Sequence, residues 1–470
     1  MSLLALTENE RAEAGRELVA LLDDYERSIP ARPIVPPTDR DALLGLLDDP
    51  FAESGVGVTR LFEDIKERVL PNSTTIAHPR FLAYVTGPPN GIAPYVEAIA
   101  AAINQNCNFA QLSPAASVIE QSVVRWLAGL FGWGGQSGGI ITDGGSMATL
   151  NALTTALHAH CPDFRARGLQ AQQAPLVLYT SEQAHRSVDK AAAILGLGLG
   201  NVRAIPTDSD FRMRADVLRQ VVEDDLAAGL RPFCVVATSG TVATGAIDPI
   251  DEIADICADH GLWLHIDGAY GGLFVLSERV RAALAACTRA DSISVDPHKL
   301  LFAPMEAGCL IVRDRRRLAD AFSFSSSYLT VADDPLMVDY MDYGPQLSRS
   351  FKAFKVWGAL RAFGVGAFRG AIDENLDLAR YFAERVTASP VMELMAPVTL
   401  TAVCLRLTTI DGSAHDTVLR KLNAEGTALL GPIRLNGRDG IRACVTNYRT
   451  TKADIDLIVD RLADLARSYG

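Results

Sequence analysis

The sequence predicts an α/β protein built on a mostly parallel sheet with helices on both faces. Between residues 138 and 312, seven short apolar runs alternate with four helical stretches, an order typical of parallel strands joined by crossover helices. The chain has 470 residues, more than one ordinary domain. We therefore expect a large sheet domain, with a helical segment before it and a smaller α/β domain after it.

The N-terminal segment, residues 1–95, is predicted to consist of helices tied by extended linkers. A helical pattern with leucines on one side covers residues 8–28, and the Pro-rich stretch 30–37 ends it. A second helical stretch runs from about 58 to 69. Since these helices make a poor core alone, we expect the segment to pack on another surface.

The large domain is expected over residues 96–365. Its apolar runs, interpreted as strands, are 138–142, 176–180, 202–206, 233–238, 262–266, 291–295 and 307–312. Its helical stretches are 146–160, 185–195, 213–228 and 250–260. Ligands of open parallel sheets bind beyond the carboxyl ends of the strands, so the polar residues after these runs are the candidates for a functional site.

The last part of the chain, residues 366–470, is expected to form the smaller domain. Its order is a helix, strands within 392–408, a helix, a strand at 441–446 and a final helix at 452–467. This mixed order indicates an α/β unit.

Composition excludes several classes of partner. The net charge of −12 and the pI near 5.2 argue against nucleic acid or an anionic membrane. No apolar run approaches the roughly 18 residues of a membrane span, and the N-terminus lacks a signal pattern. The eight cysteines are scattered without a Cys-x-x-Cys pair, which favours buried free thiols, a cytoplasmic protein and no metal site.

Two polar turns follow predicted strands. After Thr142 comes Asp143-Gly144-Gly145-Ser146-Met147, which opens a helix, so its backbone N–H groups could bind a phosphate. A plain strand–helix turn with Ser146 as N-cap fits equally well. Asp267 follows the strand at 262–266 and could keep a pyridinium nitrogen protonated, or could simply form a turn.

Lys299 and His185 complete the candidate constellation. Lys299 lies between an apolar strand and the apolar run 300–304, a setting that can destabilise its ammonium and leave an amine able to attack a carbonyl. His185, past the strand at 176–180, could stack on a planar ring, although a lone histidine more often has a capping or core role. All these groups follow strand ends of one predicted sheet, and their joint occurrence there favours a functional site.

Seven stretches of the chain carry a family resemblance. They are HPRFLAYV (78–85), SPAAS (113–117), TDGGSMATLNAL (142–153), SEQAHRSVDKAA (181–192), WLHIDGAYGG (263–272), SVDPHKLLFAP (294–304) and LSRSFKAFKVWGALRAFG (347–364). With these motifs the sequence resembles the group II pyridoxal-phosphate (PLP) dependent amino-acid decarboxylases, which act on aromatic amino acids, histidine and glutamate. The resemblance implies the aspartate-aminotransferase fold, fold type I.

The resemblance implies roles at the cofactor ring. Lys299 would bind PLP as a Schiff base and exchange protons, and Asp267 would pair with the ring nitrogen. Ala269 would contact the ring, and His185 would stack on its other face and assist proton transfer. Tyr328, in a polar segment at 323–335 that resembles the family's mobile loop, would protonate the substrate α-carbon after CO2 leaves.

It also implies a phosphate site of Gly145, Ser146 and Met147, with His298 beside it. Thr241 would contact the cofactor too, but Val242 stands where many relatives have a second threonine, so one hydroxyl is missing.

Other departures bear on the substrate. Leu300 stands where relatives often have tryptophan. Asn104, Asn106 and Asn108 occupy a stretch that supplies apolar pocket residues in aromatic decarboxylases, so they indicate either a polar pocket or turn-capping side chains. Ser348 matches relatives that act on histidine better than those that act on aromatic amino acids.

The expected activity is PLP-dependent decarboxylation of an L-amino acid to an amine and CO2, in a homodimer whose N-terminal segments wrap the partner and whose active sites lie at the interface. The substrate stays open. An aminotransferase, a decarboxylating aldehyde synthase and an inactive PLP-fold partner subunit are the alternatives. A nicotinamide enzyme is disfavoured, because Gly196, Gly198 and Gly200 follow a helix rather than a strand.

Overall fold

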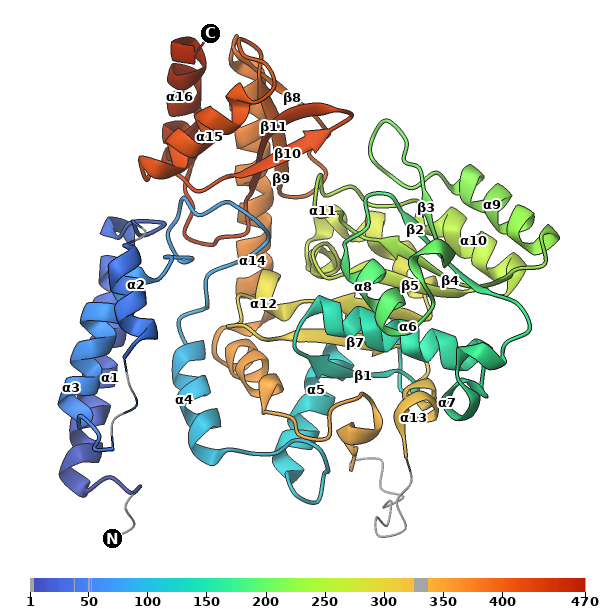
Figure 1. Ribbon diagram of the computed structural model, residues 1–470, viewed down its shortest axis with the longest axis horizontal. Helices are drawn as coiled ribbons and strands as arrows, with labels where there is room; N and C mark the ends of the chain where they lie inside the picture. The colour runs from blue at the N-terminus through green and yellow to red at the C-terminus, as the bar shows by residue number, and fades with distance from the viewer. Residues whose placement is uncertain (1–3, 38, 50, 52, 325–336, 470) are drawn as a thin grey trace.

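The computed structural model describes residues 4–37, 39–49, 51, 53–324 and 337–469. Figure 1 shows three parts: an arm of N-terminal helices, a large body around a sheet, and a smaller unit beside the upper half of helix α14. None of the helices within the described ranges is long and apolar enough to cross a membrane.

The α-helices are α1 Glu8–Ser28, α2 Arg40–Leu47, α3 Val58–Asp64, α4 Ala93–Ile103, α5 Pro114–Leu130, α6 Gly145–His160, α7 Phe164–Arg167, α8 Ser187–Ile194, α9 Ala215–Ala227, α10 Ile250–His260, α11 Glu278–Arg281, α12 Pro297–Leu300, α13 Arg316–Phe322, α14 Lys352–Ala388, α15 Ala414–Ala424 and α16 Lys452–Tyr469. The strands are β1 Gly138–Thr142, β2 Leu176–Ser181, β3 Val202–Ile205, β4 Arg231–Thr238, β5 Trp263–Gly268, β6 Ser292–Val295, β7 Gly308–Val312, β8 Met392–Leu394, β9 Ala402–Leu407, β10 Gly431–Leu435 and β11 Arg438–Cys444.

The main sheet has seven strands in the order β1-β7-β6-β5-β4-β2-β3. Strands β3, β2, β4, β5 and β6 are mutually parallel, while β7 runs antiparallel to both of its neighbours. Every apolar run predicted as a strand forms one of these seven. The prediction of a mostly parallel α/β sheet is confirmed.

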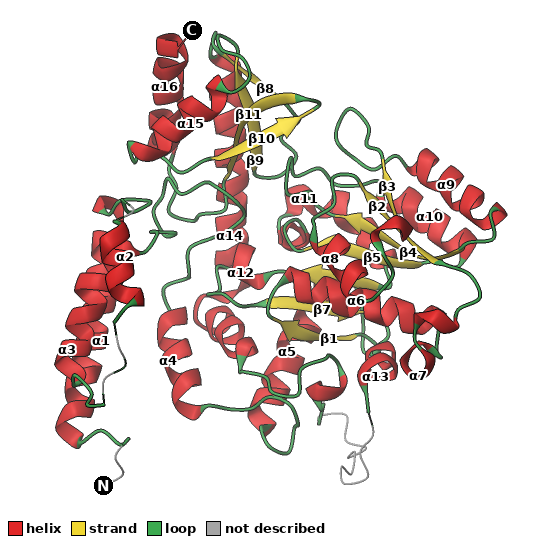
Figure 2. Ribbon diagram, viewed as in Figure 1, coloured by secondary structure: helices red, strands yellow, loops and turns green. Residues whose placement is uncertain are grey.

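Helices cover both faces of this sheet, as Figure 2 shows. In β2, Leu176 and Leu178 pack with side chains of α6 and α8, whereas Val177 and Tyr179 face the cluster that contains α9 and α10. Successive strand residues point to opposite faces, so a strand buried on both sides is mostly apolar. In β2 the polar side chains lie at the end of the strand, at Thr180 and Ser181.

The smaller unit contains a four-stranded antiparallel sheet in the order β10-β11-β9-β8, packed against α15, α16 and the second half of α14. Helix α14 is interrupted at Gly364, whose φ of +72° suits glycine. Leu82 packs into this unit's core, and Phe81 pairs with Leu429. The N-terminal third of the chain thus reaches across to the C-terminal unit.

The N-terminal arm, which we define as helices α1 to α3, lies at the left of Figure 1. A capping box between Thr7 and Glu10 starts α1, but α1, α2 and α3 have no buried side chain. Helices α1, α2 and α3 therefore lack a core of their own, and the dependence of the whole segment 1–95 on another surface stays a prediction.

Candidate active site

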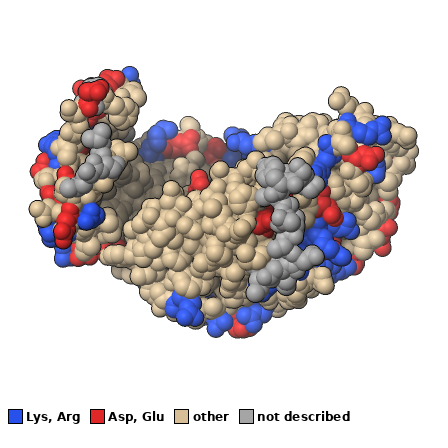
Figure 3. Space-filling model, turned by 90° about the horizontal axis from the view of Figure 1, so that it is seen from below, with Lys and Arg blue, Asp and Glu red and all other residues tan. Residues whose placement is uncertain are grey.

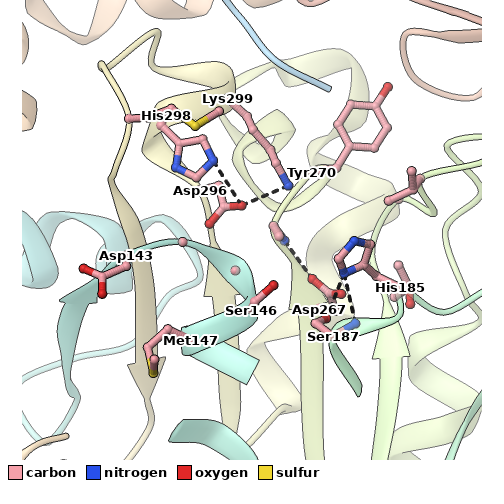
Figure 4. Close-up of a pocket in the computed structure, with 17 residues that line it drawn as sticks. Asp143, Ser146, Met147, His185, Ser187, Asp267, Tyr270, Asp296, His298 and Lys299 are labelled. Carbon is pink, nitrogen blue, oxygen red and sulfur yellow. Dashed lines mark hydrogen bonds and ion pairs between the residues drawn. The ribbon is translucent and has the colours of Figure 1, made fainter. Parts of the chain in front are cut away.

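A cavity of about 410 Å³ lies at the carboxyl ends of the parallel strands, in the size range of small-molecule sites. Its walls come from the turns after β1, β4, β5 and β6 and from the start of α8. Figure 4 shows the Lys299 amine, the Asp267 carboxylate and the His185 ring facing this common space. Among the described residues, no cluster of His, Cys, Asp and Glu side chains could hold a metal ion.

The turn after β1 presents backbone amides to the cavity. Gly144 has a φ of +136°, and a side chain at Gly308 would come within 2.4 Å of it. Met147 donates its N–H to Gly144 O, while the amides of Gly145 and Ser146 have no acceptor within the described part of the chain. These free N–H groups at the start of a 16-residue helix are suited to an anion such as phosphate.

Asp267 ends β5 with its carboxylate held on one side. Its Oδ1 accepts hydrogen bonds from Ala269 N at 3.1 Å and Ser294 Oγ at 3.3 Å. Within the described part of the chain, the hydrogen bonds to this carboxylate all end at Oδ1, so Oδ2 is left for a ligand. Behind it, burial lowers the pKa of His265 to about 4, against the opposing effect of the Asp267 charge, so this imidazole is neutral at physiological pH.

Lys299 lies in α12 with its side chain 17% exposed, and its Nζ is 2.9 Å from Asp296 Oδ2. The apolar surroundings led us to expect a destabilised ammonium. The structure adds a buried carboxylate beside this amine, which the apolar neighbours in the sequence did not indicate.

The two histidines of the site are oriented by their neighbours. His185 Nδ1 accepts the N–H of Ser187 at 3.2 Å and lies 2.9 Å from its Oγ, which places the ring proton on Nε2. His298 contacts Ala307 through Nδ1, and burial lowers its pKa, so the His298 imidazole is uncharged at neutral pH.

Most of the residues predicted from sequence meet at the cavity: Gly145, Ser146, Met147, His185, Asp267, Ala269, His298 and Lys299. Thr241 is different, since its hydroxyl bonds to Thr244 and to the amide of Ala246 inside its own turn. The neighbouring Thr238, Gly240 and Val242 line the wall instead. Tyr328 lies outside the described residues.

Asp296 and Tyr270 are among the lining residues that were not given roles from sequence. Asp296 precedes Lys299 by three residues, and this helical spacing was the available signal. Tyr270 lines the cavity and its hydroxyl bonds to Thr401, at the start of the smaller unit's sheet. No local pattern indicates that contact.

The three asparagines act as caps and turn formers. Asn104 ends α4 in the left-handed conformation, Asn106 Oδ1 accepts the N–H of Arg349, and Asn108 bonds to Leu347 O and to its neighbour's amide. None of them lines this cavity. These contacts are those of turn-capping side chains, while a role in the pocket of a partner subunit stays a prediction.

The cavity fits PLP by the chemistry of its donors. It combines free amides for a phosphate, a half-satisfied carboxylate for a ring nitrogen, an amine for an aldehyde and an imidazole beside the same space.

Comparison with known proteins agrees with this fit. The model of the pyridoxal-dependent decarboxylase conserved domain matches residues 41–408. The aromatic-L-amino-acid decarboxylase of Bacillus atrophaeus is 32% identical, over 98% of this chain and 97% of the relative. The histidine decarboxylase of Drosophila melanogaster is 33% identical, over 95% of this chain and 54% of the relative. The crystal structure of Oryza sativa TDC with PLP and tryptamine superposes with a TM-score of 0.93, at 26% identity and 99% coverage of both chains.

Proposed function

The chain belongs to the pyridoxal-dependent decarboxylase family, and we propose that it performs PLP-dependent decarboxylation of an L-amino acid with Lys299, Asp267 and His185 as its catalytic residues. Its reaction class is that of a PLP-dependent carboxy-lyase releasing an amine and CO2. The observation that supports the residue roles is the meeting of amine, carboxylate and free helix-start amides in one cavity.

When bound, PLP supplies a ring that delocalises the electrons left by departing CO2. The chain's own groups serve this chemistry. Asp267 Oδ2 is free to hold a ring nitrogen protonated, with Oδ1 fixed by Ala269 and Ser294. The amides of Gly145 and Ser146 would hold the phosphate. The Lys299 amine would bind the aldehyde carbon, and the Nε2 of His185 would hold a proton for transfer.

Covalent trapping tests the role of Lys299. The PLP-loaded protein is reduced with borohydride and digested, and the modified peptide is identified by mass spectrometry. We expect the adduct on Lys299 and its absence in Lys299→Ala. Lys352→Ala is the control, because Lys352 is a neighbouring, partly buried lysine that pairs with Asp143 at 2.8 Å. An adduct that disappears in the control but persists in Lys299→Ala would move the role to the other lysine.

We also propose that the protein is a homodimer with its active sites at the interface. Tyr95, Ile99 and Ile103 are exposed at four-residue spacing on one side of α4. Figure 3 shows few charged side chains over the centre of the lower face, and a hollow between the N-terminal arm and the body. At the cavity, Met305 is also exposed, as a surface covered by a partner would be.

Light scattering tests the dimer. We expect a dimeric mass for the native chain and a monomeric one for the double variant Ile99→Glu/Ile103→Glu. Leu457→Glu, at an exposed site on α16, is the matched control and should stay dimeric. A fully active native monomer would contradict the proposal.

We also propose domain boundaries near residues 95 and 365. The break of helix α14 at Gly364 supports the second boundary.

We further propose a cytoplasmic location. The eight cysteines, which are all buried and free, support this location. Fractionation of cells that make the protein tests it.

A further inference from the structure

Asp296 is a buried carboxylate in the cavity wall with an unusual set of neighbours. Its side chain is 2% exposed, and Oδ2 lies 2.9 Å from Lys299 Nζ. Its Oδ1 is buried and has no hydrogen-bond partner within the described ranges. Figure 4 shows the carboxylate between His298 and Lys299, with an interaction to each.

A buried carboxylate has to be stabilised by hydrogen bonds or by a charged partner, because removing it from water without either is strongly unfavourable. His298 Nε2 lies 3.6 Å from Oδ2, but burial lowers the pKa of this imidazole, so it is neutral at physiological pH. Lys299 is thus the charged partner of Asp296 in the described site.

The carboxylate lies against the turn that opens α6. A Cβ at Gly145 would lie 3.1 Å from Asp296 Oδ2 and 3.5 Å from Oδ1. Asp296 also immediately precedes α12, the short helix that carries Lys299. The ion pair therefore holds the amine close to the start of α6, where the free amides lie.

We propose that Asp296 is a positioning residue that holds the Lys299 amine as an ammonium ion whenever this amine is not bound covalently, and so sets the pH at which it becomes a nucleophile. An ammonium cannot attack a carbonyl, so the amine must first lose a proton, and the adjacent negative charge opposes that loss. The inference rests on the proposed role of Lys299, but its tests need neither PLP nor catalytic activity.

The first test measures the reactivity of Lys299 in the cofactor-free protein. Trace labelling with acetic anhydride at a series of pH values, quantified for the Lys299 peptide by mass spectrometry, gives the midpoint of amine deprotonation. We expect this midpoint to fall by about one pH unit or more in Asp296→Asn, because an opposite charge at this distance shifts a titration by that amount. At a pH below both midpoints, labelling should rise about tenfold.

Asp225→Asn is the matched control. Asp225 is also buried and ion-paired, to Arg203 at 3.0 Å, but it lies outside the cavity. Its variant should leave the Lys299 midpoint unchanged. If Asp296→Asn leaves the midpoint unchanged as well, or if Asp225→Asn moves it equally, the proposal is overturned.

A second test covers the case in which Asp296→Asn does not fold. Lys299→Met leaves Asp296 without its counter-ion, so this variant should lose stability relative to the native chain as pH rises from 5 to 8. The double variant Lys299→Met/Asp296→Asn should regain it. Equal stability of Lys299→Met and the native chain across this range would overturn the proposal. Borohydride trapping separately decides whether Lys299 binds PLP, so failure of one claim is distinguishable from failure of the other.

Discussion

Replacement of Arg349 by methionine should destabilise the protein strongly, because this arginine forms a buried ion pair behind the cavity. Arg349 and Glu120 have side chains 2% and 1% exposed, and Arg349 Nη2 lies 2.6 Å from Glu120 Oε1. The guanidinium also donates to the carbonyls of Cys107 and Ile141, each at 2.8 Å. It therefore joins the stretch before α5 to the strand that leads into the free-amide turn.

The expected loss is about 3–5 kcal/mol of unfolding free energy. Without Arg349, Glu120 keeps the hydrogen bond that it accepts from Ile141 N–H at 2.8 Å, and its charge has no counter-ion in the described site. Removing both charges with Arg349→Met/Glu120→Leu should restore most of the loss, since a well-packed apolar pair is often as stable as a buried ion pair.

Urea unfolding of the cofactor-free protein, followed by circular dichroism, measures these differences. Arg279→Met is the surface control, because Arg279 and Asp377 have side chains 40% and 50% exposed, and it should lose no more than about 1 kcal/mol. The reasoning is refuted if Arg349→Met loses no more than this control, or if the double variant is no more stable than the single one.

Three further outcomes are expected. Ser294→Ala removes the 3.3 Å donor to Asp267 and should lower kcat/KM about tenfold, whereas unchanged kinetics would show that Ser294 does not orient the carboxylate. Burial lowers the pKa of His265 to about 4 from its ordinary 6.5, so its contribution to stability is present above pH 6.5 and is lost towards pH 4, by up to about 3 kcal/mol. Urea midpoints at pH 4–7 should show this loss in the native chain and less of it in His265→Asn; equal slopes would contradict it. Tyr328→Phe should suppress clean amine formation while PLP binding survives, and an unchanged amine yield would show that the loop assignment is wrong.

The fold could be predicted because both faces of the main sheet are buried. That burial produces short continuous apolar runs, which are recognisable in the sequence without any partner. The same rule directed attention to residues after strand ends, and Asp267 and Lys299 were found by it. The antiparallel direction of β7 was not predicted, because a short apolar run has the same composition in either direction.

Sequence patterns did not predict contacts between distant parts of the chain. Arg349 and Glu120 are 229 residues apart, and neither has a local signal for its partner. The hydroxyl of Thr241 forms its hydrogen bond inside its own loop, because of the backbone geometry after β4. The contact between Lys299 and Asp296 depends on where the Asp296 carboxylate points, which the apolar neighbours in the sequence do not reveal.

The central claim is tested most directly by supplying the PLP-loaded protein with a panel of L-amino acids and following CO2 release, with mass spectrometry of the products. The account predicts stoichiometric amine and CO2 from at least one amino acid. A keto acid without CO2 would contradict it in favour of transamination, and an aldehyde with CO2 in favour of an oxidative reaction.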